Sequence, residues 1–527
     1  MPNLLQACAI NEVFPEGMKT IAFALEYDAG VTPAWLGAVR FEVIDHSYEP
    51  KIPPQKRTIQ SIYINDRPAV SGSGQASGEG RYVILGTDTE ETAAFAIGNY
   101  KMDGTFNPYG HPPVGFPDPD DPGPGGPGGK GPGGKGPGGG PPPDMEYCGP
   151  KPLNVTIRQI PAEEDVAGAE GTGTAISSPE GDGGAEGLCG GCVIMPQEVS
   201  CTTYVCRQFE GFEERSWKGL PYQLYVPQPY DPSVRYPLVL FIPDAGGRGE
   251  NPLTPLAQGI GGVCWASPED QGRHPCFIVC PAFGPKEILV DDEFRFSEKL
   301  YLSKEILDQV AAEYSIDTDR IYTTGQSMGC MSSCQLMIDF PGYFAGAVLV
   351  AGQWDPAKCG KAMKDQNLWI LVSENDRKAH AGMDAVTAAI EENGGRVVRR
   401  VWNARDAVPE LDLCARELRA AAEAEGANVR YVMFEGDSVV PGGIHPGPGN
   451  NHTNTWRVAY QIDEVRDWLF TARRPGAAAS GIAPAQAEPK GASAEAAAAG
   501  QEDISGAPAA ETACCAGKSR TVTPAAG

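Results

Sequence analysis

The sequence predicts an α/β protein, with a mostly parallel sheet covered by helices on both faces and a small all-β sandwich ahead of it. Two observations support this prediction. From about residue 216 to 473, near-continuous apolar runs alternate with segments whose apolar residues recur at helical spacing, as in a parallel sheet buried between helices. From about residue 10 to 100, short segments of alternating polarity are separated by Gly, Pro, Asp and Ser clusters, which is typical of a sandwich.

Composition restricts the classes of partner. The chain has 527 residues, 41% of them hydrophobic, and a formal net charge of −26. Its length predicts two or three domains at about 150 residues each. The acidic balance argues against nucleic acid, because phosphate binding needs surplus Lys and Arg. The sequence contains no run of about 18 apolar residues, so no membrane span is predicted. The first residues lack the basic and apolar parts of a signal peptide. We therefore expect a cytoplasmic protein, with secretion as the alternative.

The first domain is predicted to cover residues 10–215 as a sandwich with two insertions. The segment "KTIAFALEY" alternates and predicts a strand with Ile21, Phe23, Leu25 and Tyr27 on one face. Further strands are predicted in "VRFEVID", "RTIQSIYIND" and "RYVILG", and "LNVTIRQI" is expected to complete the sandwich.

Two low-complexity segments interrupt this domain, and a third follows the α/β domain. Residues 103–150 contain a GPGGK repeat, whose period of five excludes a collagen helix because that helix needs Gly at every third position. Residues 161–188 are rich in Gly, Ala and Glu. Both are predicted to be linkers without a core. Residues 216–473 form the predicted catalytic domain, and 474–527 a disordered Ala, Pro and Gly-rich tail.

The stretch "IYTTGQSMGC" contains the most informative motif. A buried strand is followed by Gly325-Gln-Ser327-Met-Gly329, and a helix is predicted from about Met328. G-x-S-x-G between strand and helix is the pattern of a nucleophile elbow, whose tight turn leaves no room for side chains at the two glycines. The turn would place the Ser327 hydroxyl at the carboxyl edge of the sheet and at a helix N-terminus, which favours developing negative charge. We predict that Ser327 is a nucleophile, and the alternative is a purely structural turn.

A serine nucleophile needs a base, and on this type of sheet the order along the chain is Ser, then Asp or Glu, then His. Three of the six histidines follow Ser327, namely His380, His445 and His452. We predict that His452, in a last loop before the final amphipathic helix, is the base. His445 in "PGGIHPGPGNN" is the alternative, and either could instead be a solvated loop histidine.

The acid is expected at the end of a later strand. The strand "LWILVSEND" ends at Asp376, which would orient the imidazole and stabilise its charged form. Glu374 and Asp437 remain as alternatives, as does a surface strand cap without a chemical role. His380 follows Asp376 too closely to be the base.

Backbone N–H groups are expected to bind the negatively charged oxygen of the tetrahedral intermediate. One donor should be Met328, the residue after the nucleophile. The second should come from the loop "PDAGGRGE" after the strand "YPLVLFI", where we assign Ala245 or Gly246. The alternative is an ordinary glycine-rich loop.

Five segments in order carry a family resemblance: "YPLVLFIPDAGGRG", "YSIDTDRIYTTGQSMG", "VLVAGQWDP", "ILVSENDRKAH" and "NHTNTWRVAYQIDEVRDWLF". Together they resemble α/β-hydrolase esterases of the feruloyl esterase, polyhydroxybutyrate depolymerase and prolyl oligopeptidase-like group. The first strands resemble the immunoglobulin-like domain that precedes some of these esterases. The resemblance implies two-step ester hydrolysis through an acyl-serine without metal or organic cofactor. Relatives usually have His-Gly where this chain has Pro243-Asp244, which brings an acid near the site.

Cysteines suggest a weaker hypothesis. Cys189, Cys192, Cys201 and Cys206 could hold zinc, but their spacing fits no common zinc module, so free thiols or disulfides are favoured. Cys330 and Cys334, one helical turn apart, are expected to be small packing residues.

The leading function is a serine esterase acting on a small-molecule or polysaccharide-linked ester. The alternatives are a serine peptidase of the prolyl oligopeptidase type, although blade repeats are not seen, and a catalytically silent binding protein. Acyl transfer to an alcohol instead of water is a further variant. The acyl group, the alcohol and the oligomeric state do not follow from the sequence.

Overall fold

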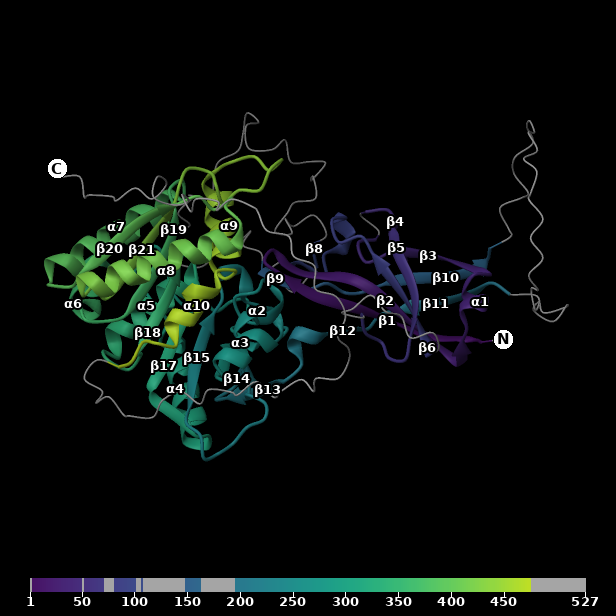
Figure 1. The fold of residues 1–527 in the computed structure, drawn as a ribbon, viewed down its shortest axis with the longest axis horizontal. Coiled ribbons are helices and arrows are strands. Elements are labelled where there is room, and N and C mark those ends of the chain that lie inside the picture. The colour runs from purple at the N-terminus through teal and green to yellow at the C-terminus, as the bar shows by residue number, and fades with distance from the viewer. Residues whose placement is uncertain are drawn as a thin grey trace, which may run out of the picture. The chain divides into compact units, whose positions relative to one another are not determined.

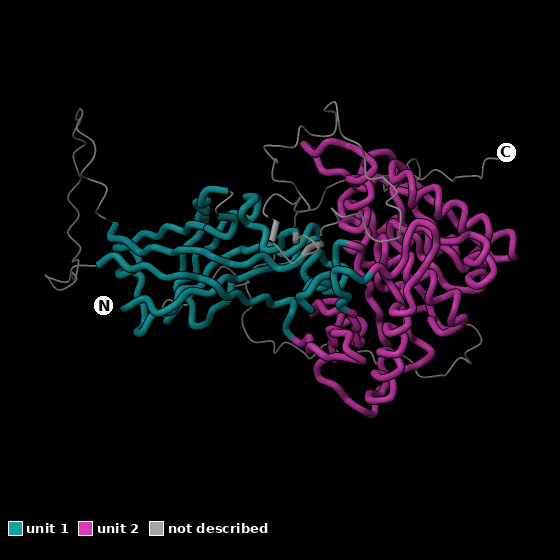
Figure 2. Tube along the Cα trace, turned by 180° about the vertical axis from the view of Figure 1, so that it is seen from behind, with its two compact units in different colours: residues 1–210, 246–263, 282–287 teal, residues 211–245, 264–281, 288–527 magenta. Residues whose placement is uncertain are grey.

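A computed structural model describes residues 2–49, 52–70, 80–100, 106–107, 147–162 and 195–474. The chain divides into two compact units (Figure 2). Unit 1 comprises residues 1–210, 246–263 and 282–287, and unit 2 comprises residues 211–245, 264–281 and 288–527. Among the residues that the structure describes, no helix is both long and apolar enough to span a membrane.

Unit 1 is an all-β sandwich. Its five-stranded sheet has the order β12-β1-β2-β6-β5, its four-stranded sheet the order β11-β10-β3-β4, and a small third sheet the order β8-β7-β9. The strands are β1 Leu4–Phe14, β2 Gly17–Val31, β3 Val39–Asp45, β4 Gln55–Lys56, β5 Ile59–Asn65, β6 Gly80–Thr87, β7 Ile97–Tyr100, β8 Phe106–Asn107, β9 Tyr147–Pro150, β10 Val155–Pro161, β11 Gln197–Cys201 and β12 Tyr204–Cys206. Short helices are α1 Pro33–Leu36, α2 Thr254–Ala257, η1 Thr92–Ala94 and η3 Arg207–Phe209.

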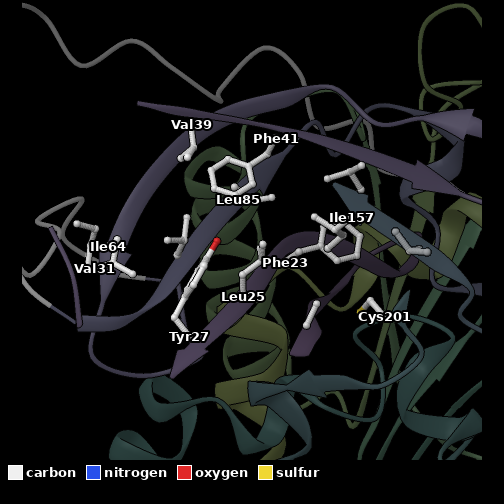
Figure 3. Packing of buried hydrophobic residues seen from close by; sticks show 14 of the residues in the cluster. Phe23, Leu25, Tyr27, Val31, Val39, Phe41, Ile64, Leu85, Ile157 and Cys201 are labelled. Atoms are coloured by element: carbon white, nitrogen blue, oxygen red, sulfur yellow. The ribbon is translucent and has the colours of Figure 1, made fainter. Parts of the chain in front are cut away.

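The core of unit 1 lies between its two larger sheets (Figure 3). Phe23, Leu25 and Tyr27 of β2 point into it, as their alternation predicts. Ile21, expected on the same face, packs against a separate cluster instead. The reason is a bulge: Ala22 pairs with Ile10 but Thr20 pairs with Asn11, so Ile21 is an extra residue that shifts the alternation.

The predicted linkers fall mostly outside the described residues, and so does the predicted tail from residue 475 onward. Two short strands, β8 and β9, lie inside the range 103–150 and pair with β7.

Unit 2 is built on a nine-stranded sheet of order β13-β14-β16-β15-β17-β18-β19-β21-β20 (Figure 1). All pairs from β16 to β20 are parallel, whereas β13 and β14 add an antiparallel edge. The strands are β13 Phe212–Trp217, β14 Leu220–Tyr225, β15 Tyr236–Ile242, β16 Phe277–Pro281, β17 Ile316–Gln326, β18 Gly346–Val350, β19 Leu368–Ser373, β20 Val397–Trp402 and β21 Val429–Phe434. Every residue of β15, β16, β18 and β19 is buried, which explains their continuous apolar sequence.

Helices cover both faces of this sheet. They are α3 Pro268–Arg273, α4 Tyr301–Glu313, α5 Met328–Asp339, α6 Pro356–Met363, α7 Arg377–Glu392, α8 Val408–Glu425, α9 Pro448–Ala459 and α10 Asp463–Leu469, with short turns η4 Ala245–Gly247, η5 Cys264–Ala266 and η6 Glu298–Leu300. Parallel crossovers are right-handed, so connections that run in opposite directions along the sheet lie on opposite faces.

This rule assigns the helices to faces. The connections holding α4 to α7 run toward β20, whereas those holding α3 and α8 run the other way. Ion pairs agree with this assignment, because α10 is joined to α3 by Arg466–Asp270 at 2.6 Å and to α8 by Arg419–Glu464 at 3.0 Å. The predicted fold class, an α/β-hydrolase sheet preceded by a small sandwich, is confirmed.

Candidate active site

The turn at Ser327 joins β17 to α5 in strained geometry. Ser327 has φ 51° and ψ −116°, a region that residues with a Cβ rarely occupy. Such a conformation costs on the order of 1–3 kcal/mol and persists only where the surroundings enforce it. Here they do, because the Ser327 N–H donates to Val350 O at 3.0 Å. The side chain is half-buried and lies at the carboxyl edge of the sheet.

The two glycines of the motif are required by close backbone contacts. A Cβ on Gly329 would lie 1.8 Å from Ile242 O, and one on Gly325 would lie 2.5 Å from the Gly329 carbonyl carbon. Both positions are occupied by main chain, which cannot rotate away. The first turn of α5 therefore packs directly on the end of β15, in agreement with the steric reason for the motif.

His452 bridges Ser327 and Asp376. Its Nδ1 lies 2.6 Å from Asp376 Oδ2, and its Nε2 lies 2.8 Å from Ser327 Oγ. A carboxylate can only accept, so Nδ1–H donates to Asp376 and Nε2 is left to accept the Ser327 O–H. The Asp376 side chain is 5% exposed and that of His452 is 30% exposed. The three predicted residues thus form one hydrogen-bonded chain, with the carboxylate shielded and the imidazole reachable.

His452 is on a helix, so its predicted position in a loop is wrong. Helix α9 begins at Pro448, and His452 lies in its second turn with its ring 5.2 Å from that of Trp456. Pro is common at the first helical position, where its missing N–H costs nothing. The Gly, Pro and Asn composition of the preceding residues hid this start.

Asp376 has a second structural task. It is the N-cap of α7, where Oδ1 accepts the Ala379 N–H at 3.2 Å. One carboxylate oxygen is therefore held by the helix and the other faces His452. The helix begins at Arg377, where this cap satisfies an N–H group of its first turn.

The alternative residues have other contacts. Glu374 Oε2 accepts the Gly436 N–H at 2.6 Å, and Asp437 Oδ1 accepts from Asn375 and Asn451. His445 is exposed, and its carbonyl accepts from Asn450 Nδ2 at 2.9 Å. His380 Nδ1 lies 3.0 Å from Glu374 O, and its Nε2 lies 3.3 Å from Asp384 Oδ2.

The predicted oxyanion donors lie at the start of α5 and just after the end of β15. Met328 is the first residue of α5, where a helix leaves N–H groups without intrahelical partners. Ala245 and Gly246 open the turn η4 just after β15. Asp244, which precedes them, is buried and accepts from Gln326 Nε2 at 3.1 Å. Gln326, which sequence reasoning passed over, thereby ties the elbow to this loop.

The cysteine hypotheses resolve only in part. Cys189 and Cys192 lie outside the described residues, whereas Cys201 and Cys206 are buried free thiols, and burial raises the pKa of each to about 12. Cys330 and Cys334 are buried in α5, as expected of packing residues. In the part of the chain that the structure covers, no group of three or more His, Cys, Asp or Glu side chains is arranged to hold a metal ion.

Comparison with known proteins agrees with this architecture. Residues 6–110 match the model of the esterase Ig-like N-terminal domain. The crystal structure of a thermostable esterase is similar with a TM-score of 0.60 and 23% identity, over 89% of this chain and 100% of the other. That likeness shows a shared fold.

Two further similarities are local or distant. Poly(3-hydroxyalkanoate) depolymerase C of Paucimonas lemoignei is 38% identical over 60 residues, which are 11% of this chain and 14% of that protein. A feruloyl esterase module from Clostridium thermocellum, complexed with sinapinate, aligns over 49% of this chain and 88% of its own with 13% identity and a TM-score of 0.33. From the domain match and the shared fold, this chain has an α/β-hydrolase fold, and its residues 6–110 match the esterase Ig-like N-terminal domain.

Proposed function

We propose that the protein is a serine carboxylic-ester hydrolase that works through an acyl-serine intermediate. The observation that supports this most strongly is the chain of hydrogen bonds from Ser327 through His452 to Asp376, at 2.8 and 2.6 Å. These lengths lie within the reach required of a nucleophile, its base and the group that orients the base.

In the first step, His452 Nε2 takes the Ser327 proton while Oγ attacks the ester carbonyl carbon. The imidazolium that forms is stabilised by the buried Asp376 carboxylate. The carbonyl oxygen becomes an oxyanion, and the Met328 N–H at the start of α5 is suited to bind it, together with the N–H of Ala245 or Gly246. Collapse expels the alcohol, which takes its proton from Nε2–H, and leaves Ser327 acylated.

In the second step, water attacks the acyl-enzyme. His452 now removes a proton from that water, and the same donors bind the second oxyanion. Expulsion of Ser327 Oγ, with return of the proton from Nε2, releases the carboxylic acid and restores the enzyme. The protons balance, because each proton taken by His452 is returned within the same half-reaction.

The substrate class follows by analogy with the similar proteins. Their names describe esterases, a feruloyl esterase module and a poly(3-hydroxyalkanoate) depolymerase, all of which act on carboxylic esters. A small-molecule ester, or an ester attached to a polymer, is therefore the class that we propose for this chain.

Labelling with a fluorophosphonate probe tests the nucleophile. Wild type should be labelled and Ser327→Ala should not, while both unfold at the same temperature, because the substitution only replaces one hydroxyl group by hydrogen. Ser333→Ala, which changes a buried serine of α5, is the matched control and should retain labelling.

Turnover then identifies the reaction. Acetyl, aryl and feruloyl esters, a soluble poly(3-hydroxyalkanoate) oligomer and short peptides would be compared at equal concentration. Ester cleavage that disappears in Ser327→Ala supports the proposal. Hydrolysis of peptides alone would replace it with a peptidase, and full ester turnover by Ser327→Ala would exclude Ser327 as the nucleophile.

A further inference from the structure

Asp437 accepts hydrogen bonds from two asparagines, one next to the candidate acid Asp376 and one next to the candidate base His452. It follows β21, beyond the end of the strand, in the loop that precedes α9. Its Oδ1 accepts Asn375 Nδ2 at 2.8 Å and Asn451 Nδ2 at 2.7 Å. Asn375 immediately precedes Asp376, and Asn451 immediately precedes His452. A single carboxylate oxygen thus connects the turn that carries the acid with the helix that carries the base.

Neighbouring contacts strengthen this connection. Asn451 is fully buried, and its Oδ1 accepts the Ser373 hydroxyl at 2.8 Å from the end of β19. Glu374 Oε2 accepts the Gly436 N–H at 2.6 Å, and the Glu374 N–H donates to Phe434 O at 2.9 Å. The ends of β19 and β21 are therefore joined at several points, and α9 is attached to that junction through Asn451.

We propose that Asp437 is a positioning residue that fixes α9, and with it the imidazole of His452, relative to Asp376. The proposal deepens the proposed function and rests on it. The physical reason is geometric: His452 is part of a helix that moves as one body, so a contact one residue before it constrains where its ring lies. The hydrogen bond from Asn375 is exposed, so the bond from the buried Asn451 should be the stronger of the two.

Asp437 is charged at neutral pH, so an electrostatic effect must be separated from a geometric one. Hydrogen bonds from Asn375 and Asn451 lower the pKa of Asp437 below its ordinary value of 3.8. The other charged groups at this junction are Asp376, Glu374 and Arg405, whose guanidinium contacts Asp437 O at 3.5 Å. In general, a nearby negative charge stabilises a protonated imidazole, whereas a purely geometric contact does not.

Two substitutions distinguish these possibilities. Asp437→Asn retains an oxygen that can accept both amide hydrogen bonds but removes the charge, so kcat should stay within about threefold of wild type. Asp437→Ala removes the acceptor, and displacement of α9 by a fraction of an ångström to about 1 Å should lower kcat about 10- to 100-fold with little change in KM. Asp365→Ala is the matched control, because Asp365 is exposed and lies just before the amino-terminal end of β19.

The pH profile of kcat/KM separates an effect of the Asp437 charge from an effect of its acceptor geometry. The acidic limb, which reports the base, should stay in place for Asp437→Asn. A shift of that limb to lower pH in Asp437→Asn would indicate that Asp437 acts by its charge. An activity of Asp437→Asn as low as that of Asp437→Ala would show that the acceptor geometry is irrelevant. Either result overturns the proposal, as does wild-type kcat in Asp437→Ala.

An NMR measurement makes the test independent of turnover. The Nδ1 proton of His452, held against Asp376, should give a far-downfield resonance that is assigned by its loss in His452→Gln. It should persist in Asp437→Asn and shift or broaden in Asp437→Ala. If wild type neither cleaves esters nor binds the fluorophosphonate, the proposed function fails, and this resonance alone decides the positioning role: an unchanged signal in Asp437→Ala contradicts it.

Discussion

Replacing Gly329 by Ala tests the contact that sets the elbow. A Cβ there would lie 1.8 Å from Ile242 O, 2.6 Å from Ile242 C and 2.8 Å from Pro243 O, all of them backbone atoms. Since Cβ atoms essentially never approach closer than 3.0 Å, α5 and the end of β15 must separate by about 1.2 Å, the difference between 3.0 and 1.8 Å. A misplacement of about 1 Å is enough to cost on the order of 100-fold in rate.

The effect on stability should be smaller than the effect on activity. Overpacking costs about 1–3 kcal/mol, and replacing Gly by Ala in a helix returns about 1 kcal/mol. We therefore expect Gly329→Ala to remain folded, with a loss of at most about 2 kcal/mol, while kcat/KM falls on the order of 100-fold because Ser327 and the loop after β15 move apart.

The assay is kcat/KM on p-nitrophenyl acetate, combined with the rate of fluorophosphonate labelling and the thermal unfolding midpoint. Gly272→Ala is the control, because Gly272 is an exposed residue of α3 with nothing within 4 Å of its added Cβ. It should keep full activity and gain slightly in stability. Wild-type activity in Gly329→Ala would refute the argument that this close contact positions the nucleophile.

Other outcomes follow from the same geometry. Asp376→Asn should lower kcat about 10⁴-fold, because an amide that donates toward Nδ1 favours the wrong imidazole tautomer. Ester kinetics would measure this loss, and the melting temperature would show separately whether the N-cap of α7 is weakened. His452→Ala should abolish turnover, whereas His445→Ala should leave it within about twofold because His445 is exposed; equal losses would contradict the assignment of the base. Lys151→Met should destabilise unit 1 by about 3–5 kcal/mol in thermal unfolding, because it leaves the Asp45 carboxylate buried without its partner at 3.0 Å. Burial raises the pKa of Asp45, but the Lys151 charge and the hydrogen bonds from Ser47 and Lys151 together hold that pKa below 3.8, so the stability from Asp45 is present above pH 3.8 and is lost as pH falls through the lower folded value.

Part of the candidate site could be predicted because it is local. The elbow needs a strand, two glycines and a helix within a few residues, and the same backbone contacts that exclude a Cβ at Gly325 and Gly329 force that pattern on the sequence. That Asp376 lies at the same edge of the sheet as Ser327 also follows from the way in which a parallel sheet brings the carboxyl ends of its strands together.

The predictions from sequence were wrong where a single residue alters the local structure. A single extra residue in β2 moved Ile21 to another cluster. Proline at the first position of α9 began a helix within a segment whose composition favours a loop, so His452 was expected in the wrong element. Both features are small in sequence, and each alters the direction of the side chains that follow.

By itself, the sequence determined the fold class, the strained serine turn and the short set of residues that could serve it, since periodicity and tight turns are properties of neighbouring residues. Only the tertiary structure shows which of the three candidate acids contacts His452. Asp376, Glu374 and Asp437 all follow strands and look alike in sequence, but one faces His452, one accepts a backbone N–H, and one joins two asparagines. Three of these four contacts join residues 62 to 76 positions apart. All four depend on how β19, β21 and α9 pack together, and no local pattern encodes that packing.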